Sequence, residues 1–354
     1  MKKLFSIAVL AAMMLPAFAA EPAENDVEYG RTITKYASTP KFGGYYIGKY
    51  AYNDKDFSKG GDGLTQRLIR AYVDGTILND FKYRVQVQMN NGSFHMKDVF
   101  VEWAKYDYFK VKVGQYKRAF GFENPMNPWD ISTGDYSLMT KYLTGHNDYV
   151  GDDAGSSNGG RDQGIQVQGD FLKVGKDNHY LFHYQVGLWN GQGINNKDKD
   201  GKKDLIGTIQ VQPIKNLFIG VFGWKGNYIA SNGVNYDRNR YAFGVKYDNK
   251  GWTLRSEYAH GQSNHDKGNA EAWYVVGGMP INDWFRVSAQ YQCYRKDKTW
   301  ERSQNIYSII PEFQLHKNLK LQIQYNYNDN RAQQFSSTGD VHYNELWAEF
   351  YFRF

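Results

Sequence analysis

The chain has 354 residues, of which 17% are aromatic, and its formal net charge is +6 at pH 7. Without Lys2 and Lys3 the charge is +4, which is too small to indicate nucleic acid as a partner. Cys293 is the only cysteine, so an intramolecular disulfide is excluded. A mean hydropathy of -0.68 usually indicates a soluble protein, but a transmembrane β-barrel contacts lipid only with every second residue and keeps an equally low average.

The first residues predict an export signal. Lys2 and Lys3 precede the apolar stretch LFSIAVLAAMML, which is too short to span a bilayer, and Ala17-Phe18-Ala19 has the small residues of a cleavage site. We therefore expect residues 1–19 to be a signal peptide and residues 20–40, which are polar and without period, to be a flexible periplasmic lead-in. Residues 41–354 are then the exported folded domain; their strand pattern, and not the signal, predicts one β-barrel in the outer membrane of a Gram-negative cell.

Alternation of apolar and polar residues predicts strands throughout this domain. In KYRVQVQM (82–89), Val85 and Val87 share one face, and Arg84 lies on the other. Such segments have about the nine to eleven residues of a tilted transmembrane strand. An even number, about sixteen, is expected, at 41–52, 64–76, 81–91, 95–105, 107–117, 161–171, 178–190, 204–212, 216–225, 239–249, 251–261, 270–278, 283–293, 304–314, 318–328 and 343–354.

The connections between these segments support a transmembrane antiparallel barrel. Long polar links follow the odd strands, with one exception, and tight links rich in Pro, Gly, Asn and Asp follow the even ones, as external loops and periplasmic turns do in outer-membrane barrels. Aromatic residues near strand ends fit interfacial girdles, among them Tyr83, Trp103, Tyr108, Trp252, Trp284, Tyr325 and Phe350. A secreted soluble β-sandwich that binds carbohydrate through surface aromatics remains an alternative, as does a barrel enzyme.

The last strand has an apolar aromatic face. Leu346, Phe350 and Phe352 share this face, and the chain ends on Phe354. A terminal strand of this kind resembles the signal by which the outer-membrane assembly machinery recognises its substrates.

A long interruption of the strand pattern at 118–160 follows the fifth strand. Its early part holds Phe120, Phe122 and Trp129, and its later part is rich in Gly, Asp, Ser and Asn, which suits a packed segment inside a wide barrel followed by a solvated return. We predict that it narrows the pore. An external lid or a disordered loop is the alternative.

VKVGQYKRAFGFENPMNPWDISTGDYSLMTKYLTG (111–145) resembles the segment after the fifth strand in the phosphate-selective porin O and P family, in the versions found in Bacteroides-like bacteria. Gly114-Gln115-Tyr116-Lys117, the Phe120-Gly121 pair and Glu123 carry the resemblance. It implies a sixteen-stranded homotrimeric channel, embedded in outer-membrane lipid, that passes anions such as phosphate. It implies neither a catalytic site nor a cofactor.

Alternation also predicts which charged residues face the lumen. The basic candidates for an anion pathway are Arg70, Lys82, Arg84, Lys110, Lys112, Arg255 and Arg286, with Lys246, Lys320 and Arg353 also directed inward. Acidic residues alternate with them, namely Asp74, Asp98, Glu102, Asp170, Glu257, Glu312 and Glu349. These acids can pair with the bases and cancel their field.

The candidate constriction residues are Lys117, Arg118, Glu123, Asp130, Asp135 and Lys141. Within 118–160 only Arg118 and Lys141 are basic, and Asp148, Asp152 and Asp153 add further negative charge. A channel for small polar solutes with little anion preference is therefore at least as well supported as a phosphate channel.

No motif indicates catalysis or a strong metal site. GSSNG (155–159) has the Gly-x-Ser-x-Gly pattern without the strand and helix that would expose its serine. NKDKDG (196–201) resembles the start of a calcium loop, but Gly207 stands where the bidentate Glu is needed. His260 and His265 lack the spacing of metal ligands.

Overall fold

The computed structural model describes residues 37–54, 62–90, 92–146, 148–150, 153–154, 159–230, 233–264, 268–296, 299–332 and 341–354. The expected signal peptide, nearly all of the lead-in, His265 and most of GSSNG lie outside the described residues. In the part that is described, no helix has the length and apolarity needed to cross a bilayer.

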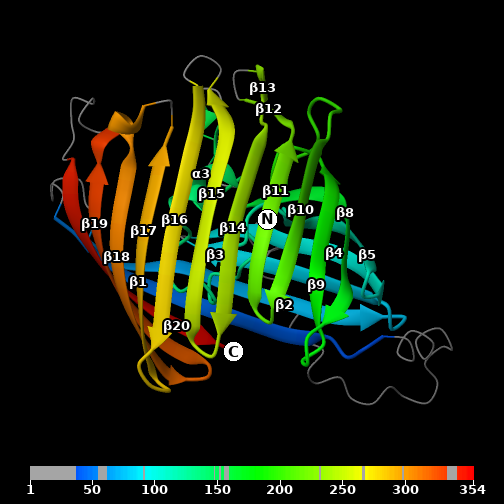
Figure 1. The fold of residues 1–354 in the computed structure, drawn as a ribbon, viewed down its shortest axis with the longest axis horizontal. Coiled ribbons are helices and arrows are strands. Elements are labelled where there is room, and N and C mark those ends of the chain that lie inside the picture. The colour runs from blue at the N-terminus through cyan, green and yellow to red at the C-terminus, as the bar shows by residue number, and fades with distance from the viewer. Residues whose placement is uncertain are drawn as a thin grey trace.

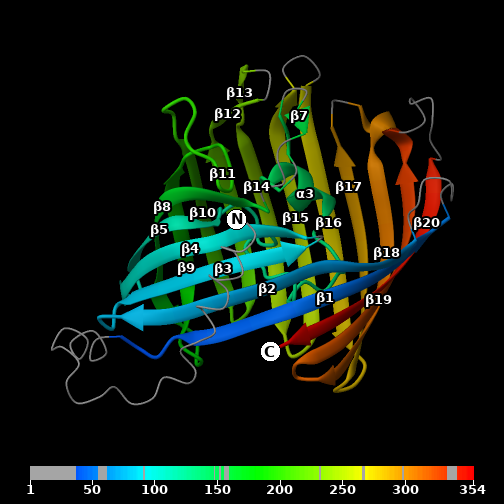
Figure 2. The same ribbon diagram turned by 180° about the vertical axis from the view of Figure 1, so that it is seen from behind.

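Sixteen antiparallel strands form one closed sheet, because β20 pairs with β1 (Figures 1 and 2). The prediction of a closed antiparallel barrel is confirmed, and each strand lies within a few residues of its expected position. The strands are β1 Lys41–Asn53, β2 Gly63–Ile77, β3 Phe81–Asn90, β4 Ser93–Tyr106, β5 Phe109–Lys117, β8 Arg161–Val174, β9 His179–Trp189, β10 Asp204–Ile214, β11 Leu217–Lys225, β14 Arg240–Asn249, β15 Trp252–Asn264, β16 Gly268–Pro280, β17 Phe285–Arg295, β18 Gln304–His316, β19 Leu319–Asn330 and β20 His342–Arg353.

Four short strands and two short helices lie outside the barrel sheet among the described residues, and none was expected from the sequence. They are β6 Tyr149–Val150, β7 Asp153–Ala154, β12 Asn227–Ile229, β13 Asn235–Asp237, α3 Leu138–Leu143 and the 3-10 helix η3 Trp300–Arg302. Each pair of short strands forms a small hairpin of its own.

Tight turns join the strands at one end of the barrel, and long loops join them at the other. Asn79, Asn178 and Asn216 have positive φ values of 63°, 51° and 70°, a left-handed conformation that Asn tolerates better than most residues in tight turns. The C-terminus lies at the turn end (Figure 1). Bacterial outer-membrane barrels have short periplasmic turns and longer external loops, so the loop end is external.

The outer face of the barrel is apolar, and the inner face is polar. On β11, Ile219 and Val221 are 52% and 56% exposed, whereas Phe222 and Trp224 are buried on the inner side. Because the sheet is closed, this exposed apolar face cannot be covered by a second sheet and fits contact with hydrocarbon. Alternation predicts that Val87 contacts hydrocarbon together with Val85. Its side chain is only 5% exposed, so other residues of the protein cover most of its surface.

Aromatic stacks border this apolar band at both ends. Toward the external loops, Trp273, Tyr291, Tyr307 and Tyr327 form a continuous row, with ring centroids 4.8, 4.8 and 6.2 Å apart. Toward the turns, the rings of Trp284 and Phe313 stack, as do those of Tyr106 and Tyr108. This arrangement matches the two aromatic girdles of a membrane barrel. The last strand follows the same rule, since Leu346, Phe350, Phe352 and Phe354 are exposed.

Candidate functional site: the inserted loop and the pore wall

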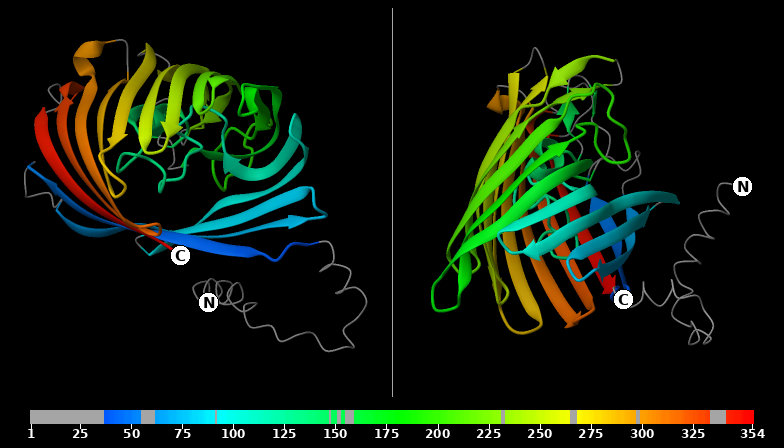
Figure 3. Two further views of the ribbon diagram at one scale, coloured as in Figure 1. Left: turned by 60° about the horizontal axis from the view of Figure 1, so that its bottom comes forward. Right: turned by 90° about the vertical axis from the view of Figure 1, so that its right-hand side faces the viewer.

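The segment between β5 and β8 lies inside the ring of strands (Figure 3). We call residues 118–160 the inserted loop. Its helix α3 packs against the inner faces of β15, β16 and β17. The expectation that this segment enters the barrel is confirmed by its described residues, which contact the wall from β11 round to β1.

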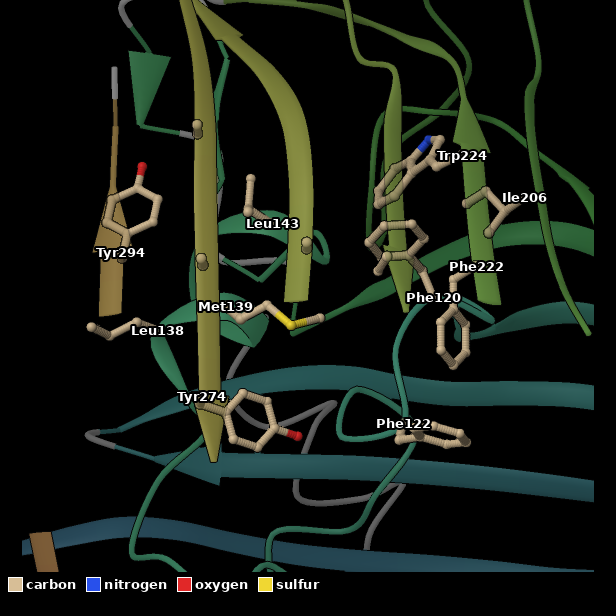
Figure 4. Close-up of a cluster of buried hydrophobic side chains, with 14 of the residues drawn as sticks. Phe120, Phe122, Leu138, Met139, Leu143, Ile206, Phe222, Trp224, Tyr274 and Tyr294 are labelled. Atoms are coloured by element: carbon tan, nitrogen blue, oxygen red, sulfur yellow. The ribbon is translucent and has the colours of Figure 1, made fainter. Parts of the chain in front are cut away.

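An apolar anchor holds the first part of the inserted loop. The Phe120 ring lies edge-on to Trp224 at 5.6 Å, and the Phe122 ring lies edge-on to Phe222 at 5.1 Å. Leu138, Met139 and Leu143 of α3 belong to the same buried cluster (Figure 4). Small inward residues on β14, β15 and β16 leave room for them, namely Ala242, Ala259, Ala270 and Ala272.

A second anchor lies at Trp129. Its ring contacts Tyr45 of β1 at 6.3 Å and Tyr351 of β20 at 5.8 Å, both edge-on. The Lys320 ammonium donates to the Trp129 carbonyl oxygen at 2.8 Å. The loop is therefore fixed at two well-separated parts of the wall, β11 and the β19–β20–β1 region.

Side chains of the wall satisfy backbone groups of the inserted loop. Glu257 accepts the N–H of Phe122 at 2.5 Å and that of Glu123 at 3.0 Å. Gln292 accepts the N–H of Leu138, and Gln324 accepts the N–H of Gly134. Irregular chain inside a barrel needs such partners, because an unpaired buried polar group is costly.

The acidic residues of the inserted loop are paired. Each one whose side chain the structure describes lies close to a basic residue. Asp135 lies 3.1 Å from Arg67 and 2.8 Å from Lys141. Burial opposes ionisation of Asp135, but the charges of Lys141 and Arg67 outweigh it and hold the pKa of this carboxyl below its usual value. The other loop acids make the pairs Glu123–Arg255 at 3.5 Å, Asp130–Arg353 at 3.6 Å and Asp148–Arg240.

Most of the basic residues predicted to line the pore are also paired. The pairs are Arg84–Asp74 at 2.7 Å, Lys110–Asp170 at 2.9 Å, Lys112–Glu102 at 3.5 Å, Arg286–Glu312 at 3.2 Å and, as above, Arg255–Glu123. Lys82 is exposed to solvent. Arg70 is different, because its guanidinium donates only to neutral atoms, Gln88 Oε1 at 2.9 Å and Tyr45 Oη at 2.8 Å.

Arg70 belongs to a group of four bases with one acid, which we call the basic cluster: Arg70, Lys97, Lys117 and Arg161, with Asp98. Arg161 binds Asp98 with two hydrogen bonds of 2.7 and 3.0 Å. Lys117 donates to Tyr136 Oη at 2.7 Å and to the Met126 carbonyl. Electrostatic interactions couple Lys97 to Arg161, Arg70 and Asp98. Arg70 and Arg161 alone already outnumber the single carboxylate of Asp98, so this part of the wall is positive.

Sequence alternation missed Lys97 because of a β-bulge. The register between β3 and β4 shifts between Val85 and Val87, which face Val99 and Met96. Met96 and Val99 are 40% and 37% exposed on the outer face, whereas Lys97 and Asp98 between them are 7% and 8% exposed. The extra residue of a bulge turns two consecutive side chains away from the lipid. Arg161 was missed because alternation gives it the outward face of Ile165, whereas its side chain is buried and bonds Asp98 inside the barrel.

Two predicted constriction residues lie inside the anchors. Arg118 is fully buried, bonds Asp162 at 2.8 Å and lies over the Trp224 ring. Glu123 is also fully buried and accepts from the N–H and hydroxyl of Ser137. The structure thus places both in the packing of the loop and not at a solvent-lined surface. Lys117 belongs to the basic cluster, and Asp135 pairs with both Lys141 and Arg67.

The carboxylates of the candidate calcium loop are already bonded to side chains elsewhere in the chain. Asp198 pairs with Lys203, and Asp200 accepts from Asn227 and Asn235. Across the described residues, no three His, Cys, Asp or Glu side chains gather as metal ligands would. His260 pairs with Glu271 at 3.1 Å on the outer face.

Protonation of His146 is expected to loosen the inserted loop. Burial, together with the charges of Lys117 and Arg161, lowers the pKa of His146 well below its usual value. The ring stays neutral in the packed loop but takes up a proton below pH of about 6.5 once exposed, so the packed state loses up to about 1.4 kcal/mol per pH unit below that value. Gating noise in single-channel records should increase at pH 5.

The His146→Gln variant provides the control for this pH dependence. The ring Nε2 lies 2.9 Å from Asn124 Oδ1, and a glutamine amide can replace that contact without titrating. Its noise should be equal at pH 5 and pH 7. The same rise at pH 5 in this variant would assign the effect to another group.

A closed barrel with an apolar outer band, aromatic girdles and a segment folded into its lumen has the architecture of an outer-membrane channel and not that of a two-sheet sandwich. The chain belongs to the Gram-negative porin family, whose model matches residues 6–333. No curated protein matches the sequence.

Several solved structures share the fold. An anion-selective porin from Comamonas acidovorans is 15% identical, with a TM-score of 0.65 over 90% of this chain and 100% of that chain. The trimer form of OmpT from Vibrio cholerae is 12% identical, with a TM-score of 0.59 over 90% and 100%. OmpF of Salmonella typhi in complex with daunomycin is 11% identical, with a TM-score of 0.63 over 89% and 97%.

Proposed function

We propose that this porin is a passive diffusion channel for small polar solutes that favours anions. The basic cluster carries the proposal, because the other basic candidates for an anion pathway are paired, apart from Lys82 at the turn end, whereas Arg70, Lys97, Lys117 and Arg161 lie around one carboxylate. Charges beside a narrow water-filled path lower the barrier for ions of opposite sign, because little water is present to screen them. Similarity in fold to an anion-selective porin agrees with this proposal.

Phosphate is the anion that we propose for the cluster. Guanidinium groups hold phosphate through parallel hydrogen bonds, and ammonium groups add point charges. The segment 111–145, with its resemblance to the phosphate-selective O and P porins, supports the same assignment. The loop acids do not argue against it, since each one whose side chain the structure describes pairs with a base.

The sign of the reversal potential tests the function. In planar bilayers with a KCl gradient, the wild-type channel should give the potential of an anion-selective pore, and added phosphate should reduce chloride current. A cation-selective or neutral potential would contradict the proposal.

We further propose a homotrimer that contacts its copies through the outer face of β1–β5. Exposed apolar side chains gather there, including Phe42, Phe94, Met96, Val99 and Val113. OmpT of Vibrio cholerae forms trimers on a similar fold. Native mass spectrometry in detergent should give three chains per particle, and a single chain at all concentrations would contradict the proposal.

We also propose that residues 1–19 are removed on export and that Phe354 contributes to recognition by the assembly machinery. Its ring is 62% exposed, while its backbone N–H and C=O pair with Gly44 at 3.0 Å and help to close the barrel. The Phe354→Ala variant retains this backbone pairing but loses the ring. We expect several-fold less protein in the outer membrane, measured by immunoblot of membrane fractions.

Refolding in detergent separates recognition from folding. Phe354→Ala should refold from urea as well as the wild type, because the backbone pairing remains. Equal loss of refolding would show that the ring acts in barrel closure alone.

A further inference from the structure

The outer face of β10 and β11 carries a groove at two facing glycines. Gly207 and Gly223 are partners in the register, and both lie on the lipid-facing side because Ile206, Phe222 and Trp224 are directed inward. A Cβ at Gly223 would meet no atom within 4 Å. Packing within the chain therefore does not require glycine at 223, where the missing side chain leaves the groove open, whereas a Cβ at Gly207 would lie 3.2 Å from the Gln185 carbonyl oxygen.

The groove is apolar along its length. Its volume is about 680 Å³, and the exposed side chains of Val186, Ile209 and Val221 form its sides. Toward the turns it reaches an aromatic stack in which the Phe171 and Phe182 rings are 5.2 Å apart with an interplanar angle of 20°. It therefore runs through the band of the barrel that faces hydrocarbon.

A cation lies beyond the external end of the groove. Lys225 is the last residue of β11, two residues after Gly223 and on the same face, opposite Leu205. Its side chain is exposed, and no carboxylate of the described chain pairs with it. Nearby, the exposed Leu205 and Tyr241 continue the apolar surface up to this lysine.

We propose that the groove holds one acyl chain of an outer-leaflet lipid whose anionic headgroup contacts Lys225. At the glycines the acyl chain can lie below the level of the neighbouring side chains, and the aromatic stack limits how far it extends toward the turns. The lysine lies at the external interface, where the headgroup of an outer-leaflet lipid is located. A Lys near a membrane surface favours anionic lipid by about a factor of five. The site combines one positive charge with one apolar channel, which fits an anionic lipid better than a soluble anion.

Native mass spectrometry of delipidated protein can test this site. Phosphatidylglycerol and phosphatidylcholine with identical acyl chains are the probes. The wild type should retain phosphatidylglycerol preferentially, and Lys225→Gln should reduce this preference about fivefold. The double variant Gly207→Val, Gly223→Val fills the groove and should reduce retention of both lipids.

Two matched controls come from the same wall. Gly277→Val adds a side chain at another outward glycine with open space around it. Lys215→Gln removes an exposed lysine at the periplasmic end of the same β10–β11 hairpin. Both should bind lipid like the wild type.

Three outcomes would overturn the proposal. They are equal retention of the two lipids by the wild type, unchanged retention in both the glycine and the Lys225 variants, and dissociation of an oligomer in the glycine variants without any change in bound lipid. The last result would assign the groove to a neighbouring subunit. Lys225 is exposed, so its variant tests the site even if the glycine variants fold poorly.

Discussion

Replacing Arg70 and Lys97 with glutamine is expected to lower the anion-to-cation permeability ratio about fivefold for each charge removed, because a unit charge a few ångströms from the path of an ion is worth about 1 kcal/mol even in water. The double variant leaves Lys117 and Arg161 against Asp98, so much of the positive excess disappears. Reversal potentials in a KCl gradient give the ratio directly. Single-channel conductance should change much less.

A paired charge elsewhere in the lumen provides the control. Lys110 and Asp170 lie 2.9 Å apart and are both partly exposed. Removing both charges with Lys110→Gln and Asp170→Asn should leave the reversal potential unchanged, because the pair has no net charge. If this control shifts selectivity as much as the Arg70 and Lys97 variant does, the basic cluster is not the site of selection.

The Glu257→Ala variant should widen the pore. Glu257 is 1% exposed and accepts two backbone N–H groups of the inserted loop, so its removal leaves two buried donors without partners at a cost of roughly 2–6 kcal/mol. The loop should then leave the wall, while the hydrogen bonds of the barrel sheet persist. We expect a higher single-channel conductance and faster liposome swelling in large oligosaccharides.

Two further variants are expected to widen the pore by smaller amounts. Glu257→Gln keeps one acceptor oxygen and should widen the pore less. Gln292→Ala removes the acceptor of only one loop N–H, that of Leu138, and should have the smallest effect. Wild-type conductance in Glu257→Ala would show that the apolar contacts of Phe120, Phe122 and Trp129 hold the loop without this carboxylate.

Local sequence patterns predict the barrel and the position of the inserted loop in the chain. A closed sheet in a membrane exposes alternate residues to lipid and to water, so each strand shows a period of two in its sequence. The even strand number and the unequal connection lengths can likewise be recognised from short stretches of sequence. The resemblance at 111–145 identified the segment that enters the lumen. It could not place α3 or the two anchors, because these depend on which wall residues leave space.

Which charges remain unpaired depends on contacts between strands and is seen only in the folded barrel. Arg84, Lys110 and Lys112 look like an anion pathway in the sequence, yet each meets an acid on a neighbouring strand, and the register that pairs them is not visible along one strand. Strict alternation along β4 would place Lys97 on the outer face, but a β-bulge turns its side chain inward. Alternation is a local property, whereas charge compensation arises between strands far apart in sequence, so the basic cluster becomes visible only in the closed barrel.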